Sequence, residues 1–148
     1  MQADTSGKSG QIGDIEELEH TADLSIRVRG RDLPALFINA ARGMFGLMAD
    51  LAALEAAEPR LQHEITLQEY DREILLVAWL SELLWLNEEH GVVFTRYAIT
   101  TFTPTQLHAT VWGTPAPEQW KNIKAVTFHD LDIIETDDGY QVTLVFDV

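Results

Sequence analysis

Three short stretches of the sequence carry side chains that could do chemistry. The stretch His20–Asp23 (HTAD) combines an imidazole with a carboxylate, Ile123–His129 (IKAVTFH) contains a lysine and a histidine, and the sequence closes on Phe146–Val148 (FDV). An imidazole and a carboxylate can share a metal ion or a proton. Carboxylate oxygens held next to each other suit a hard cation such as calcium or magnesium.

The closing stretch places two anions side by side. Apolar residues occupy every second position from Tyr140 to Val148, so we expect a strand that reaches the last residue. Such a strand would hold the Asp147 side chain next to the carboxylate of Val148, which is unfavourable unless a cation or a donor compensates the charge. The alternative is that Asp147 is a solvated residue at the end of a strand, and spacing alone favours this alternative.

The other two stretches also have ordinary explanations. His20 and Asp23 could bind a metal or exchange a proton, or they could form a hydrogen-bonded turn before a strand. Zinc is disfavoured because the five histidines lack paired-ligand spacing and the chain has no cysteine. Lys124, one of three lysines, could contact a phosphate or an acidic group of a partner, or could serve solubility alone.

The charge balance narrows the range of partners. The chain has 24 acidic and 10 basic residues among 148, a formal net charge of −14. This charge opposes binding to a nucleic-acid backbone or an anionic membrane, and it suits hard cations and basic proteins. Residues 74–86 are too few to span a bilayer, and no secretory signal precedes them. We therefore expect a cytoplasmic protein without tight nucleic-acid or membrane binding.

Hydrophobic periodicity predicts the elements that must position these residues. Spacings of three and four predict helices near 33–49 and 71–88, with Asp32 and Asp71 as N-caps and Gly91 after the second helix. The second helix is apolar on most sides, which predicts burial of its tryptophans. A period of two predicts strands at 24–30, 61–68, 92–103, 107–113, 125–134 and 140–148.

This order of elements predicts an α+β fold. We expect a single two-layer domain over residues 14–148, with a mixed or antiparallel sheet covered on one face by the two main helices. Residues 1–13, rich in glycine and polar side chains, are predicted to be a mobile N-terminal tail. Asp138-Gly139 predicts a hairpin between the last two strands.

Taken together, the sequence resembles the archease family over about residues 15–148. The matching stretches are 20–26 (HTADLSI), 36–45 (LFINAARGMF), 79–84 (WLSELL), 123–127 (IKAVT) and 146–148 (FDV). Ser25 stands where many members have glycine and Phe128 where tyrosine is common. These differences concern the local surface and leave the resemblance intact.

The resemblance implies an archease-like fold and a role as protein cofactor rather than enzyme. Members of the family promote guanylylation and repeated turnover of the RtcB-type RNA-splicing ligase, which acts in tRNA splicing and RNA repair. The resemblance implies a metal site at Asp23, Asp147 and Val148, holding calcium, with magnesium or manganese as alternatives. The resemblance also implies Lys124 as a functional residue, and His20 and His129 are further candidates because their imidazoles lie in the same stretches.

Two other classes of function compete with this interpretation. Asp23 and Asp147 could hold magnesium in a metal-dependent hydrolase in which Lys124 stabilises charge. The chain could instead be an acidic, chaperone-like module whose metal is only structural. Hydrolysis by the purified protein without a ligase would favour the first, and ligase activation that survives removal of both aspartates would favour the second.

Overall fold

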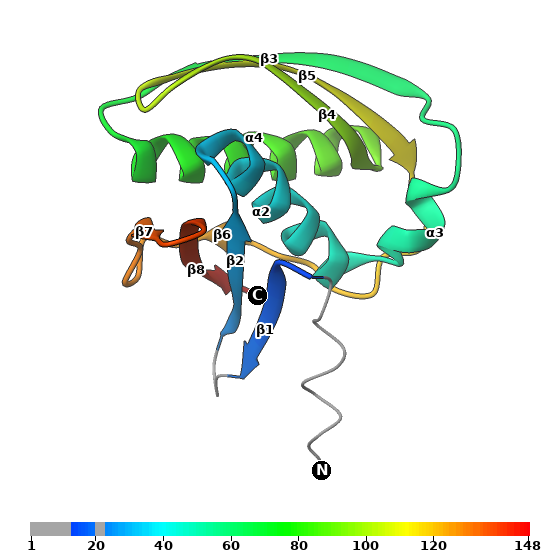
Figure 1. Cartoon of the computed structure of the whole chain (residues 1–148). Coiled ribbons are helices and arrows are strands. Elements are labelled where there is room, and N and C mark those ends of the chain that lie inside the picture. The colour runs from blue at the N-terminus through cyan, green and yellow to red at the C-terminus, as the bar shows by residue number, and fades with distance from the viewer. Residues whose placement is uncertain (1–12, 20–22) are drawn as a thin grey trace.

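The computed structural model of the protein, which describes residues 13–19 and 23–148, places helices between two antiparallel sheets (Figure 1). In Figure 1 the smaller sheet lies above helices α2 and α4, and the larger sheet lies below them. The core contains side chains from both helices and both sheets. Within these described ranges, no helix is long and apolar enough to cross a membrane.

The larger sheet has the strand order β1-β2-β8-β6, and β7 also pairs with β8. Its strands are β1 (Ile15–Glu19), β2 (Leu24–Gly30), β6 (Ala125–Val126), β7 (Ile134–Thr136) and β8 (Gly139–Asp147). The two short strands pair with opposite ends of β8, because β7 meets its first residues and β6 its last. In β2, Ile26 and Val28 face the core, whereas Arg27 and Arg29, which alternate with them, remain partly or largely accessible.

The smaller sheet has the order β3-β5-β4. Its strands are β3 (Leu61–Gln68), β4 (Val92–Thr103) and β5 (Gln106–Pro115). Ile65 and Ala109 are directly paired and buried, which places the inner face of this sheet against the helices. The strand periods at 24–30, 61–68, 92–103, 107–113 and 140–148 are thereby confirmed.

Helix α2 (Leu33–Met48) begins where the polar pattern predicts. The Asp32 carboxylate accepts a hydrogen bond from the backbone N–H of Ala35 at 2.9 Å, which satisfies a donor that the first helical turn leaves free. Asp50 then caps a separate short helix, α3 (Leu51–Glu55). The apolar series of the sequence therefore continues past the end of α2 into a second helix.

A polar contact ties α2 to α3 at this junction. The Arg42 guanidinium donates from Nε to Glu55 Oε2 at 2.8 Å, and this hydrogen bond is the main reason that the pKa of Arg42 is raised. Burial raises the pKa of the neighbouring Tyr97, whose hydroxyl donates to the Phe94 carbonyl at 2.7 Å. Because both pKa values are raised, Arg42 stays protonated and Tyr97 stays neutral at neutral pH. The contact is therefore structural.

Helix α4 (Arg72–His90) crosses the middle layer between the sheets. Asp71 accepts from the N–H of Ile74 at 2.8 Å at its start, and Gly91 ends it with φ of 65°, a conformation that glycine adopts without steric cost. Trp79 is fully buried, and its indole N–H donates to the Phe37 carbonyl at 2.9 Å, which joins α4 to α2.

The number of layers differs from the prediction, although the α+β class with antiparallel sheets is confirmed. We expected one sheet with helices on one face, and the structure has two sheets with the helices between them. The physical reason lies in α4, because a helix that is apolar on most sides must be covered on more than one side. The periodicity predicted each strand but could not divide the strands between sheets.

The predicted strand at 125–134 is also wrong, because the structure forms β6 and β7 with a turn between them. Asp130 has φ of 51° in this turn, and Leu131 donates to the Phe128 carbonyl at 3.1 Å. Beyond it, the Ile133 N–H and carbonyl are bonded by the Glu73 and Arg72 side chains rather than by a strand. In addition, β1 was not predicted, because three of its five residues are glutamates.

Candidate functional site

Two of the predicted site residues lie at the same end of the larger sheet. Leu24 in β2 pairs directly with Phe146 in β8, and the strands are antiparallel. Asp23 precedes Leu24 and Asp147 follows Phe146, so both aspartates stand just beyond this last pair. Although 124 positions separate them in the chain, the strand register brings both carboxylate-bearing residues to one edge of the molecule.

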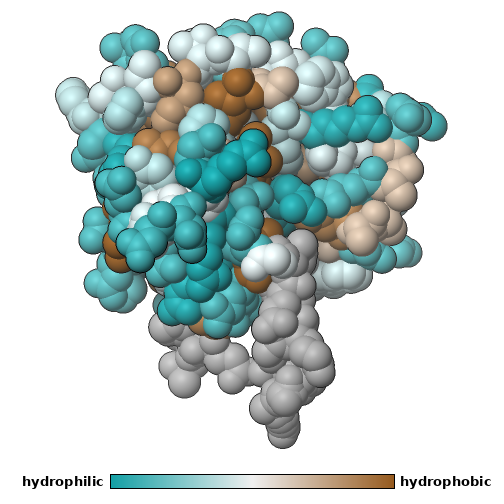
Figure 2. All heavy atoms as spheres, in the orientation of Figure 1, coloured by the Kyte–Doolittle hydropathy of each residue, from teal (hydrophilic) through white to brown (hydrophobic). Residues whose placement is uncertain are grey.

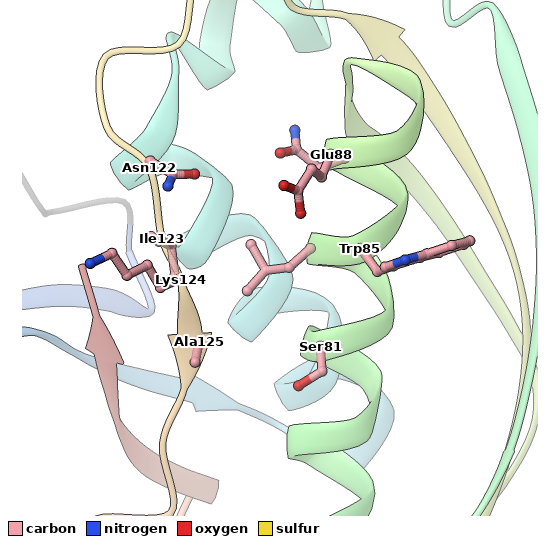
Figure 3. Close-up of a pocket in the computed structure, with 9 residues that line it drawn as sticks. Ser81, Trp85, Glu88, Asn122, Ile123, Lys124 and Ala125 are labelled. Carbon is pink, nitrogen blue, oxygen red and sulfur yellow. The ribbon is translucent and has the colours of Figure 1, made fainter.

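Lys124 joins the same end of the sheet from the other side of β8. Ala125 in β6 pairs with Asp147, and the backbone N–H of Lys124 donates to the Asp147 carbonyl at 2.8 Å. Figure 3 shows that the Lys124 side chain points away from α4, on the side where β8 ends. The strand-end cluster, defined as Asp23, Lys124, Asp147 and Val148, therefore combines residues from three chain segments.

The cluster is accessible to a partner or an ion. Asp147 and Lys124 are exposed, Val148 is 41% exposed and Asp23 is half-buried. The carboxylates supply oxygen donors only, which suit calcium, magnesium or manganese better than zinc. A cationic side chain beside them offers a second point of attachment for an anionic group.

No group of three or more histidine, aspartate or glutamate side chains that could hold a metal occurs within residues 13–19 and 23–148. The predicted metal ligands comprise only two side-chain carboxylates, together with the carboxylate of Val148. These donors fit a hard cation by their chemistry. The metal site therefore remains a prediction.

A buried hydroxyl lies next to the cluster in β2. Ser25 is fully buried, and its Oγ has no hydrogen-bond partner among the residues that the structure describes. It pairs across the sheet with Val145, two residues before Asp147, just as Ser25 itself stands two residues after Asp23. An unpaired buried hydroxyl costs free energy, so this end of the sheet carries a polar group that the packing alone does not satisfy.

Of the two predicted histidines, only His129 lies within the described residues, and it does not join the cluster. His20 lies outside the described residues. His129 follows β6, where the chain has run along β8 away from Asp147, and its imidazole Nε2 lies 3.2 Å from Asp130 Oδ2. The His129 side chain is largely exposed, and the acidic residue that it contacts is its chain neighbour Asp130.

One surface feature was missed by the sequence interpretation. Trp85 was predicted to lie in the core with Trp79, but its side chain is 54% exposed. It lines a pocket between α4 and residues 122–125, on the helix side of the segment that carries Lys124. Ser81, Trp85 and Glu88 recur at helical spacing along this part of α4, and that recurrence could have indicated an exposed stripe.

The surface as a whole is polar. Figure 2 shows hydrophilic residues over most of the visible face, with hydrophobic residues in small groups between them. This distribution agrees with the net charge of −14. Large exposed hydrophobic side chains are few in the described part of the chain, and they include Trp85, Trp120, Phe128 and Tyr70.

Comparison with known families and proteins matches this arrangement to one family. A model of the Archease protein family (MTH1598/TM1083) matches residues 15–148. The chain is 33% identical over 141 residues to a protein called "Protein archease" from Methanosarcina acetivorans, covering 90% of this chain and 94% of that protein. A "Protein archease" from Saccharolobus islandicus is 36% identical over 139 residues, covering 90% and 98% of the two chains.

Solved structures show the same fold. The solution structure of Methanobacterium thermoautotrophicum protein 1598 superposes with a TM-score of 0.73 at 28% identity, covering 93% of this chain and all of that one. The crystal structure of a Thermotoga maritima protein, described as "an archease, possible chaperone", gives a TM-score of 0.59 at 21% identity, covering 88% and 94% of the two chains. The latter similarity concerns the fold alone.

Proposed function

The chain belongs to the archease family, and from this we propose that it acts as a protein cofactor of an RtcB-type RNA-splicing ligase. In this role it promotes guanylylation of the ligase and allows repeated turnover in tRNA splicing or RNA repair. It is not itself the enzyme that joins RNA. The observation that carries the proposal is the strand-end cluster, which gathers residues from three of the five stretches of the sequence that resemble the family.

The proposed metal ligands are the carboxylates of Asp23, Asp147 and Val148. When bound, calcium would supply positive charge that lets these anions approach the oxygens of a partner group. Strand pairing supports the site, because Leu24 opposite Phe146 brings the two aspartates to one edge without a loop between them. Because these residues lie at the ends of paired strands, a binding ion has less conformational entropy to remove.

Lys124 is proposed to contact an anionic group at the same edge. Its backbone is held by the hydrogen bond to Asp147, while its exposed ammonium extends on the side where β8 ends (Figure 3). A flexible point charge at this position can pair with a phosphate or carboxylate that reaches the cluster. Lysine and carboxylates together therefore present both signs of charge to one partner.

The net charge supports a protein partner rather than direct binding to RNA. At −14 the chain repels a nucleic-acid backbone, whose affinity for proteins depends on lysine and arginine contacts. The same charge speeds encounter with a basic surface, such as one that binds RNA. We propose the cytoplasm as the place where the chain meets its ligase.

A chaperone-like role is the second candidate, because the Thermotoga maritima relative is described as a possible chaperone. In that role the strand-end cluster would hold a structural ion, and its loss would lower stability before it changed any interaction. A metal-dependent hydrolase would use the same carboxylates, and hydrolysis by the purified chain without a ligase would favour it over the cofactor role.

The test combines the purified chain with its cognate ligase and GTP. We expect substoichiometric amounts to accelerate ligase guanylylation and to permit repeated RNA joining. Asp147→Asn should remove this effect, whereas Glu135→Gln, which removes one charge from β7 near the other end of β8, should retain it. Guanylylation at the same rate with and without the chain would overturn the proposal, as would equal activity of the two variants.

A further inference from the structure

A small pocket lies next to the strand-end cluster, between α4 and residues 122–125. Its volume is about 220 Å³, below the range of about 300–1,000 Å³ that is typical of sites for whole small-molecule ligands. It is open to the surface and lined by polar and apolar side chains from both walls. Its size suits one side chain of another molecule better than a cofactor.

The charge that faces the pocket is negative. Figure 3 shows the Glu88 carboxylate pointing from α4 toward the opposite wall, whereas the Lys124 ammonium points away from α4. Lys124 therefore contributes its backbone to the lining and directs its charge elsewhere. Glu88 takes part in no ion pair among the described residues, so its carboxylate is free to accept hydrogen bonds.

Further oxygens line the same space. The Ser81 hydroxyl lies on the α4 wall and the Asn122 amide on the opposite wall (Figure 3). Asn87, which is only 7% exposed, uses its Nδ2 to donate to the Val92 carbonyl at 2.7 Å. This bond fixes the amide, and its carbonyl oxygen remains an acceptor. The pocket thus offers several acceptors around one carboxylate.

Two exposed indoles accompany these polar groups. Trp85, whose indole points from α4 away from the opposite wall (Figure 3), is 54% exposed, and Trp120, in the segment leading to Asn122, is 65% exposed. Exposed tryptophan is unusual on a polar surface and is enriched where proteins bind each other. The pocket is therefore placed within a surface suited to a protein rather than a free solute.

We propose that this pocket receives one arginine side chain from a basic protein partner. A guanidinium carries five N–H donors in a planar fork, which matches a carboxylate and additional oxygens better than the compact ammonium of lysine. The identification of this partner with the ligase rests on the proposed function above. The arginine would then anchor the ligase beside the cluster and bring its anionic groups within reach of Lys124.

The first experiment needs no ligase. NMR spectra of the full chain are recorded during titration with N-acetyl-arginine methylamide, with the corresponding lysine and glutamine derivatives as controls. We expect saturable shifts at Ser81, Glu88 and Asn122, strongest with arginine. Glu88→Gln should weaken this binding about tenfold, whereas Glu89→Gln, an exposed neighbour outside the pocket, should leave it unchanged.

Absence of saturable shifts at the pocket would overturn the proposal. Equal binding by the two variants would do the same, and stronger binding of the lysine derivative would overturn the choice of arginine.

A second experiment separates this inference from the proposed function. The dissociation constant of the chain and its ligase is measured for wild type, Glu88→Gln and Glu89→Gln, and we expect only the first substitution to raise it, about tenfold. A ligase that binds wild type and Glu88→Gln equally would refute the pocket while leaving cofactor activity intact. If the chain bound the arginine derivative but did not bind the ligase, the arginine pocket would be supported and the proposed function would be refuted.

Discussion

The two ends of β8 are built in different ways. At its start, Gly139 has φ of 142°, and a side chain there would collide with the Gly30 carbonyl and lie 2.8 Å from the Arg31 Cα. The Arg72 guanidinium also lies over the Tyr140 ring, 5.7 Å from its centre. At its far end the buried Phe146 is followed at once by the exposed Asp147.

The difference suggests that one end of β8 serves the stability of the fold and the other end serves the candidate site. The Gly139 end is closed by backbone contacts that admit no larger residue, so changes there should be expressed as lost stability. At the Asp147 end the charged side chains lie close together and are exposed to solvent, and exposed charges contribute little to stability. Residues that do not stabilise the fold are free to serve a partner, which is why the strand-end cluster is the better candidate site.

The largest expected effect comes from Asp23→Asn. It removes one proposed metal ligand and should reduce ligase activation about 100-fold, since even groups that only orient metal ligands can cost 10–100-fold. Thermal unfolding should change little, because the side chain is half-buried at a strand end. Asp138→Asn, in the turn before Gly139, is the matched control. A large loss of stability with activation retained would show that the two ends do not differ as described.

Gly139→Ala should have the next largest effect, now on stability. The positive φ and the contact with Gly30 both oppose a Cβ atom, so we expect the free energy of unfolding to fall by about 2 kcal/mol. Urea denaturation measures this change. The folded fraction should activate the ligase normally, and a selective loss of activation would contradict the assignment of this end to folding.

Residues appended after Val148 should have a smaller effect on the other end. A short Gly-Ser segment after Val148 would replace the proposed Val148 carboxylate by a neutral peptide carbonyl, and we expect calcium affinity to fall about tenfold. Isothermal titration with calcium measures the affinity, and an extension at the N-terminus serves as the control. Unchanged affinity would remove Val148 from the proposed ligands while leaving both aspartates in place.

Glu16→Gln should have the smallest effect. Glu16 pairs with Arg27 at 3.1 Å midway along β2, and both side chains are about a third or more exposed. Such pairs contribute about 0.5 kcal/mol. Urea denaturation should show a change of this size, and ligase activation should be unaltered. A much larger loss would mean that the middle of the sheet, rather than the Gly139 end, dominates its stability.

Much of the local structure could be predicted because its causes are local. Asp32 and Asp71 cap the helices that their positions predicted, Gly91 ends α4, and the period of two located β2 and β8. Capping, turns and alternation depend on a few neighbouring residues. The hairpin before β8 was also predicted, although the register places Asp137 and Asp138 at its tip and Gly139 in the strand.

The errors have a common physical origin. Trp85 lies in an apolar run, yet it is exposed, because the direction in which a helix faces depends on what packs around it. Residues 125–134 alternate like one strand, yet Ile133 accepts a hydrogen bond from Arg72 and donates one to Glu73 where a strand partner would have been needed. The partners of Ile133 lie 60 and 61 positions away in the chain, beyond the reach of a local pattern.

The sequence by itself determined the two main helices, most of the longer strands, the acidic surface and the residue types available for chemistry. It could not determine that Asp23 and Asp147 share an edge, because residue patterns report periodicity and not which strands pair. That decision came from the antiparallel pairing of β2 with β8, which sets Leu24 against Phe146. Tertiary structure likewise divided the strands between two sheets, since burying an all-round apolar α4 requires cover on both sides.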